Sequence, residues 1–504
     1  MVEWWVVLVS ISFVLLIKAI HGIVVPASRA TLPPGPWAVP LIGNVELVTT
    51  SLYDLPLFIR SLHAKFGPLV TLSLGSSKHI FVSDASIAYE ALIQKGPDFA
   101  DRPIPSITVK IASYNQYNIN TAHYGPKWRL LRRNLTTGFL HSSSQISYSV
   151  QNKVLQALVE ELSQSTGPVQ VLDHFRRAMF FSLCLVCFGE NIDYQQVMKL
   201  QRKTDRLSSN VHRFALLNAF PNISKILLRK QWAEFQEMMK DNDEAMLPFI
   251  QARRKTVQGK SKDQSSGFAY LDTLFNLSEK KEEVPDGALI SLCFEFLVAA
   301  TDSTSTTMQW ILANLVKQQA IQEKLHKNIR EIMVKDMNDE TGEEKVIKHE
   351  ELGKMKYVKA VVLETLRRHP PGPVLLPHMV TKDEVLAGHL VPKNSCIHFM
   401  VGEIGLDPKV WDEPLEFRPE RFVNREFDLT GTKGIEMIPF GAGRRMCPGY
   451  AFAMEQLEFL VANLVWRFQF KEVEGVGVDL TEKREFTVGM KHPLQMYCVP
   501  RTSH

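Results

Sequence analysis

Apolar residues recur at helical spacing along most of the chain, whereas the alternating patterns typical of strands are short and few. The first strand-like runs are Leu69–Leu74 and His79–Val82, and Gly75 between them predicts a hairpin. Helical patterns then dominate to about residue 370, after which short strands, prolines and glycines alternate. We therefore predict a mainly α fold with a minor β component.

The N-terminal segment is more apolar than the rest. Trp4–Ile17 carries only two polar residues, both serines, and snorkelling of Lys18 extends the apolar stretch to about 20 residues. Glu3 precedes this run while Lys18 and Arg29 follow it, so the positive-inside rule places the rest of the chain in the cytosol. We predict a transmembrane signal anchor at residues 1–25, a proline-rich hinge at 26–40 and a single large domain at 41–504.

One long helix is predicted at Leu289–Lys317. Its middle, Phe294–Ala300, is apolar nearly all round, which is typical of a buried helix. A run of hydroxyl residues with one acid, Thr301–Thr307, follows at once. A carboxylate at Asp302 is costly there unless it has partners or a chemical task. The adjacent hydroxyls can bond back to the helix and open a kink.

Bulk composition narrows the function only slightly. The net charge of +4 over 504 residues gives no reason to expect nucleic-acid binding, and 45% hydrophobic with 22% charged residues is ordinary for a globular protein. Six scattered cysteines do not suggest a disulfide framework. Cys184 and Cys187 lie in an apolar run, so we read them as part of a buried helix. The polar breaks Gln251–Gly267 and Val334–Glu350 predict solvated loops.

The segment Phe440–Gly449 places Cys447 at the end of a glycine-rich loop, just after two arginines. A helix is predicted to begin at Pro448, and helix N-termini favour the thiolate form, a soft ligand for iron. The glycines let the backbone approach a flat cofactor, whose carboxylates Arg444 or Arg445 can meet bidentately. The simpler reading is a buried cysteine beside a glycine turn.

Phe-x-x-Gly-x-Arg-x-Cys-x-Gly at residues 440–449 resembles the haem-binding loop of the cytochrome P-450 superfamily, in which the cysteine is the axial iron ligand. The resemblance implies haem b as cofactor and Cys447 as its metal ligand, with Phe440, Gly441 and Arg445 around it. Trp128 and Arg132 match the family's Trp-x-x-x-Arg segment, which binds a haem propionate. His378 is positioned like a further propionate-binding residue. A basic surface helix and an ordinary loop histidine are the alternatives for these two sites.

Ala299–Thr304 resembles the family's oxygen-activation motif, in which an acid and an alcohol relay protons. The resemblance implies this role for Asp302 and Ser303, with Thr304 able to share it. Ala300 stands where glycine is usual and Ser303 where threonine is usual. The alternative for Asp302 is a solvated carboxylate at a helix bend.

Glu364 and Arg367 lie three residues apart on the helical stretch Met355–Arg368, and Phe417–Phe422 follows downstream. This combination is similar to the family's Glu-x-x-Arg and Phe-x-Pro-Glu-Arg-Phe motifs. The resemblance implies a buried structural network of Glu364, Arg367 and Arg421.

The motifs occur in the family's order over the whole chain. Their amino-acid sequences are most similar to those of plant microsomal A-type members, in particular the plant family numbered eighty-nine. The resemblance implies a triangular helical domain with a long central helix and small sheets. It also implies a haem-thiolate monooxygenase in the endoplasmic reticulum membrane, with its catalytic domain facing the cytosol. Such an enzyme takes electrons from NADPH through NADPH-cytochrome P-450 reductase and places one atom of O₂ in a hydrophobic substrate.

By the same resemblance the pocket draws on Arg102–Ser113, Phe294–Thr301, Pro373–Leu376 and Phe486–Gly489. Two rivals remain open: a reductase-independent isomerase or dehydratase on the same fold, and a haem-binding protein without catalysis. The uninterrupted haem loop, Asp302 and Ser303 speak against the first, while Ala300 and Ser303 leave room for the second.

Overall fold

The computed structural model describes residues 31–39, 42–50, 54–141, 144–219, 221–259, 268–277, 283–335, 346–484 and 487–501. The predicted anchor at 1–25 lies outside the described residues, and so does part of the hinge. The described part of the hinge lies along the folded domain, because the carbonyl oxygen of Pro34 accepts a 2.8 Å hydrogen bond from the N–H of Thr71.

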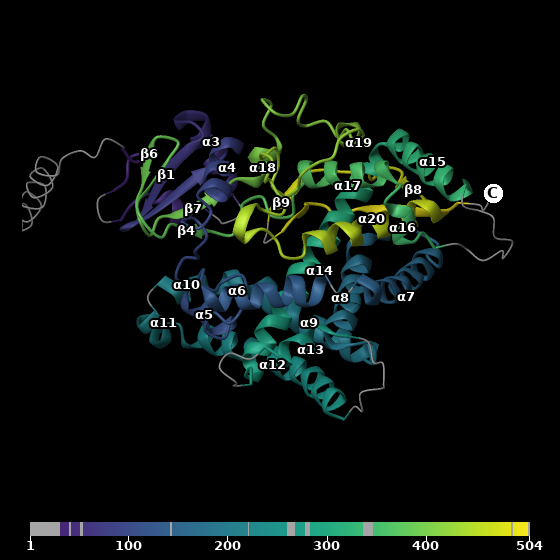
Figure 1. The fold of residues 1–504 in the computed structure, drawn as a ribbon, viewed down its shortest axis with the longest axis horizontal. Coiled ribbons are helices and arrows are strands. Elements are labelled where there is room, and N and C mark those ends of the chain that lie inside the picture. Colours follow the sequence, from purple (N-terminus) through teal and green to yellow (C-terminus); the bar gives the residue numbers. More distant parts are fainter. Residues whose placement is uncertain are drawn as a thin grey trace, which may run out of the picture.

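The fold is mainly helical with small sheets, as the periodicity predicts, and the long helix α14 (Asp286–Lys317) crosses the middle of the molecule (Figure 1). Before α14 the described helices are α2 (Glu46–Thr49), α3 (Leu55–Phe66), α4 (Ala85–Tyr89), η1 (Glu90–Gln94), α5 (Ile107–Ala112), α6 (Pro126–Arg133), η2 (Asn134–Leu140), α7 (Ser144–Ser163), α8 (Val171–Phe188), α9 (Tyr194–Asn210), η3 (Val211–Phe214), α10 (Ala215–Ala219), α11 (Pro221–Leu227), α12 (Arg229–Gln258) and α13 (Tyr270–Phe275). After it come α15 (Gln319–Lys335), α16 (His349–Leu352), α17 (Lys356–Arg368), α18 (Val401–Gly405), α19 (Glu420–Val423), η4 (Gly443–Arg445) and α20 (Tyr450–Arg467).

Four small sheets make up the described β component. The largest has the strand order β1-β2-β7-β4, in which β1 and β2 form the predicted antiparallel hairpin and β2 pairs with β7 in parallel. Its strands are β1 (Leu69–Leu74), β2 (Ser77–Val82), β7 (Cys396–Phe399) and β4 (His378–Met379). The others combine β3 (Val169–Gln170), β11 (Gln495–Pro500) and β8 (Phe468–Glu472), then β9 (Glu482–Arg484) with β10 (Val488–Met490), and β5 (Glu384–Leu386) with β6 (His389–Val391).

The core is organised around α14. Its C-terminal half packs with α17, α20 and β8 in one hydrophobic cluster, and its N-terminal half packs with α6, α8 and α13 in another. The helices α5–α13 therefore form one half of the molecule, and the sheets with α15–α20 form the other (Figure 1). Between residues 294 and 303 this helix keeps accessible surface at Phe294, Glu295, Val298, Ala299, Ala300, Asp302 and Ser303. Glu295, Ala299 and Ser303 lie one turn apart on a single face and form the open stripe of α14.

The structure corrects three boundaries. α12 continues to Gln258, so the first part of the predicted loop Gln251–Gly267 is helical, and α15 likewise extends to Lys335. α20 begins at Tyr450 with Gly449 as its N-cap. The prediction that the helix begins at Pro448 is therefore wrong by two residues. Pro448 and Gly449 instead form a turn between Cys447 and the helix. α14 is the only described helix long and apolar enough to span a bilayer, and it is the helix on which the core is built.

Candidate functional site

The loop that carries Cys447 closes on itself. The N–H of Cys447 donates a 2.8 Å hydrogen bond to the carbonyl of Phe440, so the chain returns to its starting point within seven residues. Gly443 has a φ of +67°, and a Cβ there would lie 2.1 Å from the carbonyl oxygen of Leu92 in η1. Gly441, with a φ of +70°, permits the turn. Glycine is therefore required at these bends, and the loop lies directly on η1.

The thiol of Cys447 is held where a free thiolate is unfavourable. Burial raises the pKa of Cys447, whereas the N–H of Gly449 and the charge of Arg132 lower this pKa. A coordinated metal ion would deprotonate this thiol and offset the cost of burying the thiolate. The position of Cys447 therefore suits a metal ligand.

A cationic and aromatic cluster lies beside the loop. Two guanidinium groups lie over the indole ring of Trp128, that of Arg445 at 4.6 Å and that of Arg132 at 5.7 Å from the ring centroid. Trp128 is 5% exposed, and its Nε1–H is buried and finds no hydrogen-bond partner among the described residues. Arg132 donates to the carbonyl of Met446, next to Cys447. The predicted pair Trp128 and Arg132 is thus brought to the loop by α6.

Arg445 and His378 lie in the same region. Arg445 donates three hydrogen bonds, to the carbonyls of Ala100, Ile119 and Ala122, at 2.7 to 3.0 Å. His378 is 3% exposed, and its Nδ1 donates to the carbonyl of Phe99 at 2.7 Å, which fixes the tautomer of the neutral ring. Burial, followed by the charge of Arg102, lowers the pKa of His378 to about 3.

These groups fit a flat cofactor that carries a metal and carboxylates. The described residues include no ion pair between a carboxylate and Arg102, Arg132 or Arg445, although burial lowers the pKa of each guanidinium. The unpartnered indole N–H of Trp128 points to the same conclusion, since buried donors are normally satisfied. An anionic group beside a thiolate ligand would satisfy all of them, and haem has both the carboxylates and the metal.

The acid and the alcohols of the central motif lie on different faces of α14. Asp302 forms an ion pair with Arg176 of α8 at 3.5 Å, and burial raises its pKa while Arg176 lowers it. Ser303 belongs to the open stripe, and its hydroxyl donates to the carbonyl of Ala299 at 2.7 Å. Thr304 is buried at 4% exposure. α14 runs through this segment as a continuous helix, so back-bonding occurs without a break.

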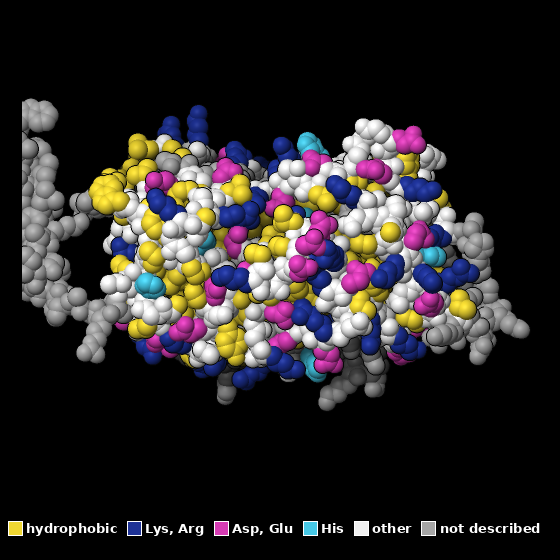
Figure 2. All heavy atoms as spheres, turned by 90° about the horizontal axis from the view of Figure 1, so that it is seen from above, with side chains coloured by type: hydrophobic (Ala, Val, Ile, Leu, Met, Phe, Trp, Pro, Cys, Tyr) yellow, Lys and Arg dark blue, Asp and Glu magenta, His cyan; other side chains and the backbone are white. Residues whose placement is uncertain are grey.

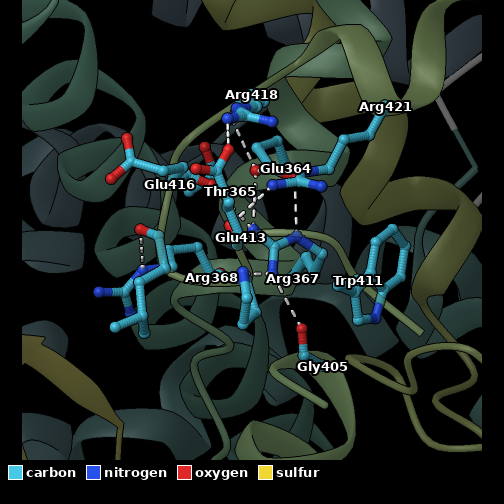
Figure 3. Close-up of polar contacts among 12 residues, drawn as sticks. Glu364, Thr365, Arg367, Arg368, Gly405, Trp411, Glu413, Glu416, Arg418 and Arg421 are labelled. Carbon is cyan, nitrogen blue, oxygen red and sulfur yellow. Dashed lines mark hydrogen bonds and ion pairs between the residues drawn. The ribbon is translucent and has the colours of Figure 1, made fainter. Parts of the chain in front are cut away.

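Glu364, Arg367 and Arg421 are brought together in a buried network on α17 and α19 (Figure 3). Arg421 Nε lies 3.4 Å from Glu364 Oε1, and the same oxygen accepts the N–H of Arg418 at 2.8 Å. The remaining donors of Arg367 reach the backbone carbonyls of Gly405, Pro414 and Glu416. The network therefore ties α17 to the chain that leads into the cysteine loop.

Two residues of this region belong to predicted pocket segments, but the sequence did not predict what they contact. Arg102 donates to the carbonyls of Asn120, Leu376 and Pro377, and nothing in its sequence context marks these contacts. Glu295 accepts hydrogen bonds from the N–H groups of Ile119 and Asn120. A signal for Glu295 existed, because a carboxylate within the apolar run Phe294–Ala300 needs partners.

With this geometry established, comparison with known proteins decides the family. The family model described as Cytochrome P450 matches residues 33–499. The chain belongs to the cytochrome P450 family. A curated relative, "Cytochrome P450 89A9" of Arabidopsis thaliana, is 42% identical over 99% of this chain and 98% of its own length, which confirms the resemblance to the plant family numbered eighty-nine.

Other relatives extend this picture of a cytochrome P450. "Pluviatolide synthase" of Podophyllum peltatum is 30% identical over 98% of this chain and 97% of its own length. A solved zebra fish cytochrome P450 with progesterone superposes with a TM-score of 0.75 at 23% identity, covering 89% of this chain and 99% of that one, which shows the shared fold. The protein is thus a cytochrome P450 monooxygenase, and the family implies haem with a cysteine thiolate ligand.

Proposed function

We propose that this cytochrome P450 places one oxygen atom of O₂ in a hydrophobic plant metabolite, with Cys447 as the axial ligand of haem b. The observation that carries the proposal is the buried, unpartnered Nε1–H of Trp128, with two guanidiniums over its ring, beside the cysteine loop. Trp128, Arg132 and Arg445 would hold the propionates, and His378 would join them once its Nε2 is protonated, while Phe440 and Gly441 shape the loop. When bound, the haem supplies O₂ activation and oxygen transfer.

The protein would supply protons from α14. Asp302 is half-buried and paired with Arg176, so it can exchange protons with solvent from the α8 side. Ser303 lies on the open stripe, and rotation of its hydroxyl away from the Ala299 carbonyl frees the proton for donation. Thr304 is the neighbouring alcohol and, being buried, serves as the second donor.

The substrate would bind along the open stripe of α14, against the predicted pocket segments. Leu375, from Pro373–Leu376, lies next to the cysteine loop, because a Cβ at Gly441 would be 3.6 Å from its methyl groups. The stripe residue Ala299 is apolar and accessible. Both features support a hydrophobic substrate. Phe486, from the fourth pocket segment, lies outside the described residues.

A basic face would receive the NADPH-dependent reductase. The side chains of Arg129 and Arg444 both lie against Tyr124, so α6 and the cysteine loop contribute to one surface. Arg133 is exposed on the same helix, and Lys127 lies over the ring of Tyr117. Positive charge on this face complements an acidic electron donor.

Exposed apolar side chains support attachment to the endoplasmic reticulum membrane, with the catalytic domain in the cytosol. Trp37 is 79% exposed and lies shortly after the predicted anchor. In α10 and α11 the side chains of Leu216, Ile226 and Leu227 are 64%, 75% and 74% exposed. α11 and the β1 sheet lie toward the same end of the molecule in Figure 1, and Figure 2, seen from the side of the β1 sheet, shows hydrophobic side chains at that end.

The test is expression in microsomes with a plant reductase, followed by a reduced carbon-monoxide difference spectrum. Thiolate ligation predicts an absorbance near 450 nm, which Cys447→Ala abolishes. Turnover of a plant metabolite extract should require NADPH and carry one atom of ¹⁸O₂ into product. Turnover without NADPH and O₂ would instead favour the isomerase or dehydratase, and a normal spectrum with no turnover of any kind would favour the non-catalytic haem protein.

A further inference from the structure

The backbone of residues 119 and 120 is held on both sides by charged side chains. The N–H of Ile119 donates to Glu295 Oε2 at 2.8 Å, and the N–H of Asn120 donates to Glu295 Oε1 at 2.7 Å. On the other side the carbonyl of Ile119 accepts from Arg445 at 3.0 Å, and that of Asn120 accepts from Arg102 at 2.8 Å. Two consecutive residues thus link, through their backbone groups, a carboxylate on α14 to two guanidiniums.

The same segment has a second attachment to α14, two turns earlier. Tyr114, Asn115 and Gln116 have φ values of 46°, 58° and 62°, an unfavourable left-handed run for residues other than glycine. Tyr114 then lies against Gly287, where a Cβ would be 2.4 Å from its ring. The strained turn persists because both of its ends are fixed, one at Gly287 and the other at Glu295.

The attachment reaches the predicted substrate pocket. Arg102 also donates to the carbonyls of Leu376 and Pro377, at 2.9 and 2.8 Å. Glu295 lies on the open stripe of α14, one turn before Ala299. Three chain segments that the resemblance assigns to the pocket therefore meet at the peptide groups of Ile119 and Asn120.

We propose that Glu295 is a positioning residue that holds the 114–122 segment against α14 and thereby sets the room available to a bulky hydrophobic substrate. The inference rests on the proposed function. The carboxylate acts through the loop and does not touch the reacting atoms. Its two acceptor oxygens match two consecutive N–H groups, a match that an amide cannot reproduce because its NH₂ group would face one of those donors.

Glu295→Gln in the full-length holoprotein tests this, with Glu351→Gln as the matched control. The Glu351 carboxylate is also buried and accepts a backbone N–H, that of Lys348 at 2.7 Å, but it belongs to α16. The probes are imidazole, which is small, and clotrimazole, which fills a large pocket. Binding of each is followed by the shift of the haem Soret band, and hydrogen exchange is measured for the amides of Ile119 and Asn120.

We expect Glu295→Gln to keep the 450 nm band and to bind imidazole within about twofold of wild type, while clotrimazole affinity falls about tenfold. Exchange at both amides should accelerate. Unchanged clotrimazole affinity or unchanged exchange overturns the proposal, as does an equal loss for imidazole, clotrimazole and the Glu351→Gln control. A wild-type protein without the 450 nm band would instead refute the proposed function.

If Glu295→Gln does not accumulate with haem, Gly287→Ala provides the second test. The added methyl group displaces Tyr114 and leaves the Glu295 carboxylate in place. Clotrimazole affinity should fall while imidazole affinity stays within about twofold. Wild-type affinity for clotrimazole in this variant overturns the proposal.

Discussion

The Glu364 carboxylate and the Arg367 guanidinium face each other through two hydrogen bonds of 2.7 and 2.8 Å, and neither side chain has any exposed surface. Such a pair is costly to break, because the surviving partner is left as an uncompensated buried charge. The consequences extend to the chain between α18 and α19, since Arg367 also holds the carbonyls of Gly405, Pro414 and Glu416.

Glu364→Ala is therefore expected to destabilise the fold by about 3–5 kcal/mol and to yield protein without haem. The measurement is the 450 nm absorbance per unit of purified protein. Glu416→Ala is the control, because only the backbone carbonyl of Glu416 accepts from Arg367 and its side chain is exposed. Full haem occupancy in Glu364→Ala would show that the network is dispensable.

Gly443→Ala is expected to disrupt the cysteine loop. The φ of +67° costs an alanine about 1–2 kcal/mol, and the new Cβ would also lie 2.1 Å from the carbonyl oxygen of Leu92. Gly449→Ala is the matched control, since a Cβ there meets nothing within 4 Å. Thermal unfolding and haem content should both drop for the first variant, and equal losses in the two would argue against a specific requirement at Gly443.

Trp128→Phe tests the unpartnered indole N–H. The substitution keeps an aromatic ring beside Arg132 and Arg445 but removes the donor, so haem should transfer to apomyoglobin about tenfold faster. Trp232→Phe removes an indole N–H that already has a partner in Ser224 and should leave the transfer rate unchanged. A wild-type transfer rate in Trp128→Phe would mean that this donor does not hold the cofactor.

Ser303→Ala tests the proton relay. Because proton transfer by a positioned group typically contributes 10²–10⁴-fold, product formation should fall by about tenfold or more while NADPH consumption continues and peroxide appears. Ser305→Ala, two residues after Ser303 on the opposite side of α14 and fully buried, removes a hydroxyl without this role. Unchanged product per NADPH in Ser303→Ala would exclude Ser303 and favour Thr304.

The fold was predictable where local pattern is strong. The hairpin around Gly75, the buried α14 and the helix that carries Glu364 all follow from periodicity. The hydrogen-bond partners of the charged site residues could not be predicted, because these partners are backbone groups that lie far away in the sequence. Arg102 donates to the carbonyl of Leu376, 274 residues away, and the spacing within a motif cannot predict such a contact. Glu295 was visible as an anomaly, yet its partners Ile119 and Asn120 lie 176 and 175 residues away.

The pH dependence of stability provides the last prediction. Burial raises the pKa of Glu295 to about 7, opposed by its two backbone hydrogen bonds and by the charges of Arg102 and Arg445; the phenol of Tyr270 also faces it. The folded state thus binds the proton more tightly than the unfolded chain, whose glutamate titrates near 4.5. Stability contributed by Glu295 is therefore fully present below about pH 4.5 and is lost as pH rises to about 7.

The measurement is the difference in unfolding free energy between wild type and Glu295→Gln across this window. A shift of this size corresponds to about 1–3 kcal/mol, and the variant, which has no ionisable group at the position, should lack that share of the pH dependence. Parallel pH profiles for the two proteins would mean that Glu295 does not titrate in this range and that the loop is held independently of its charge.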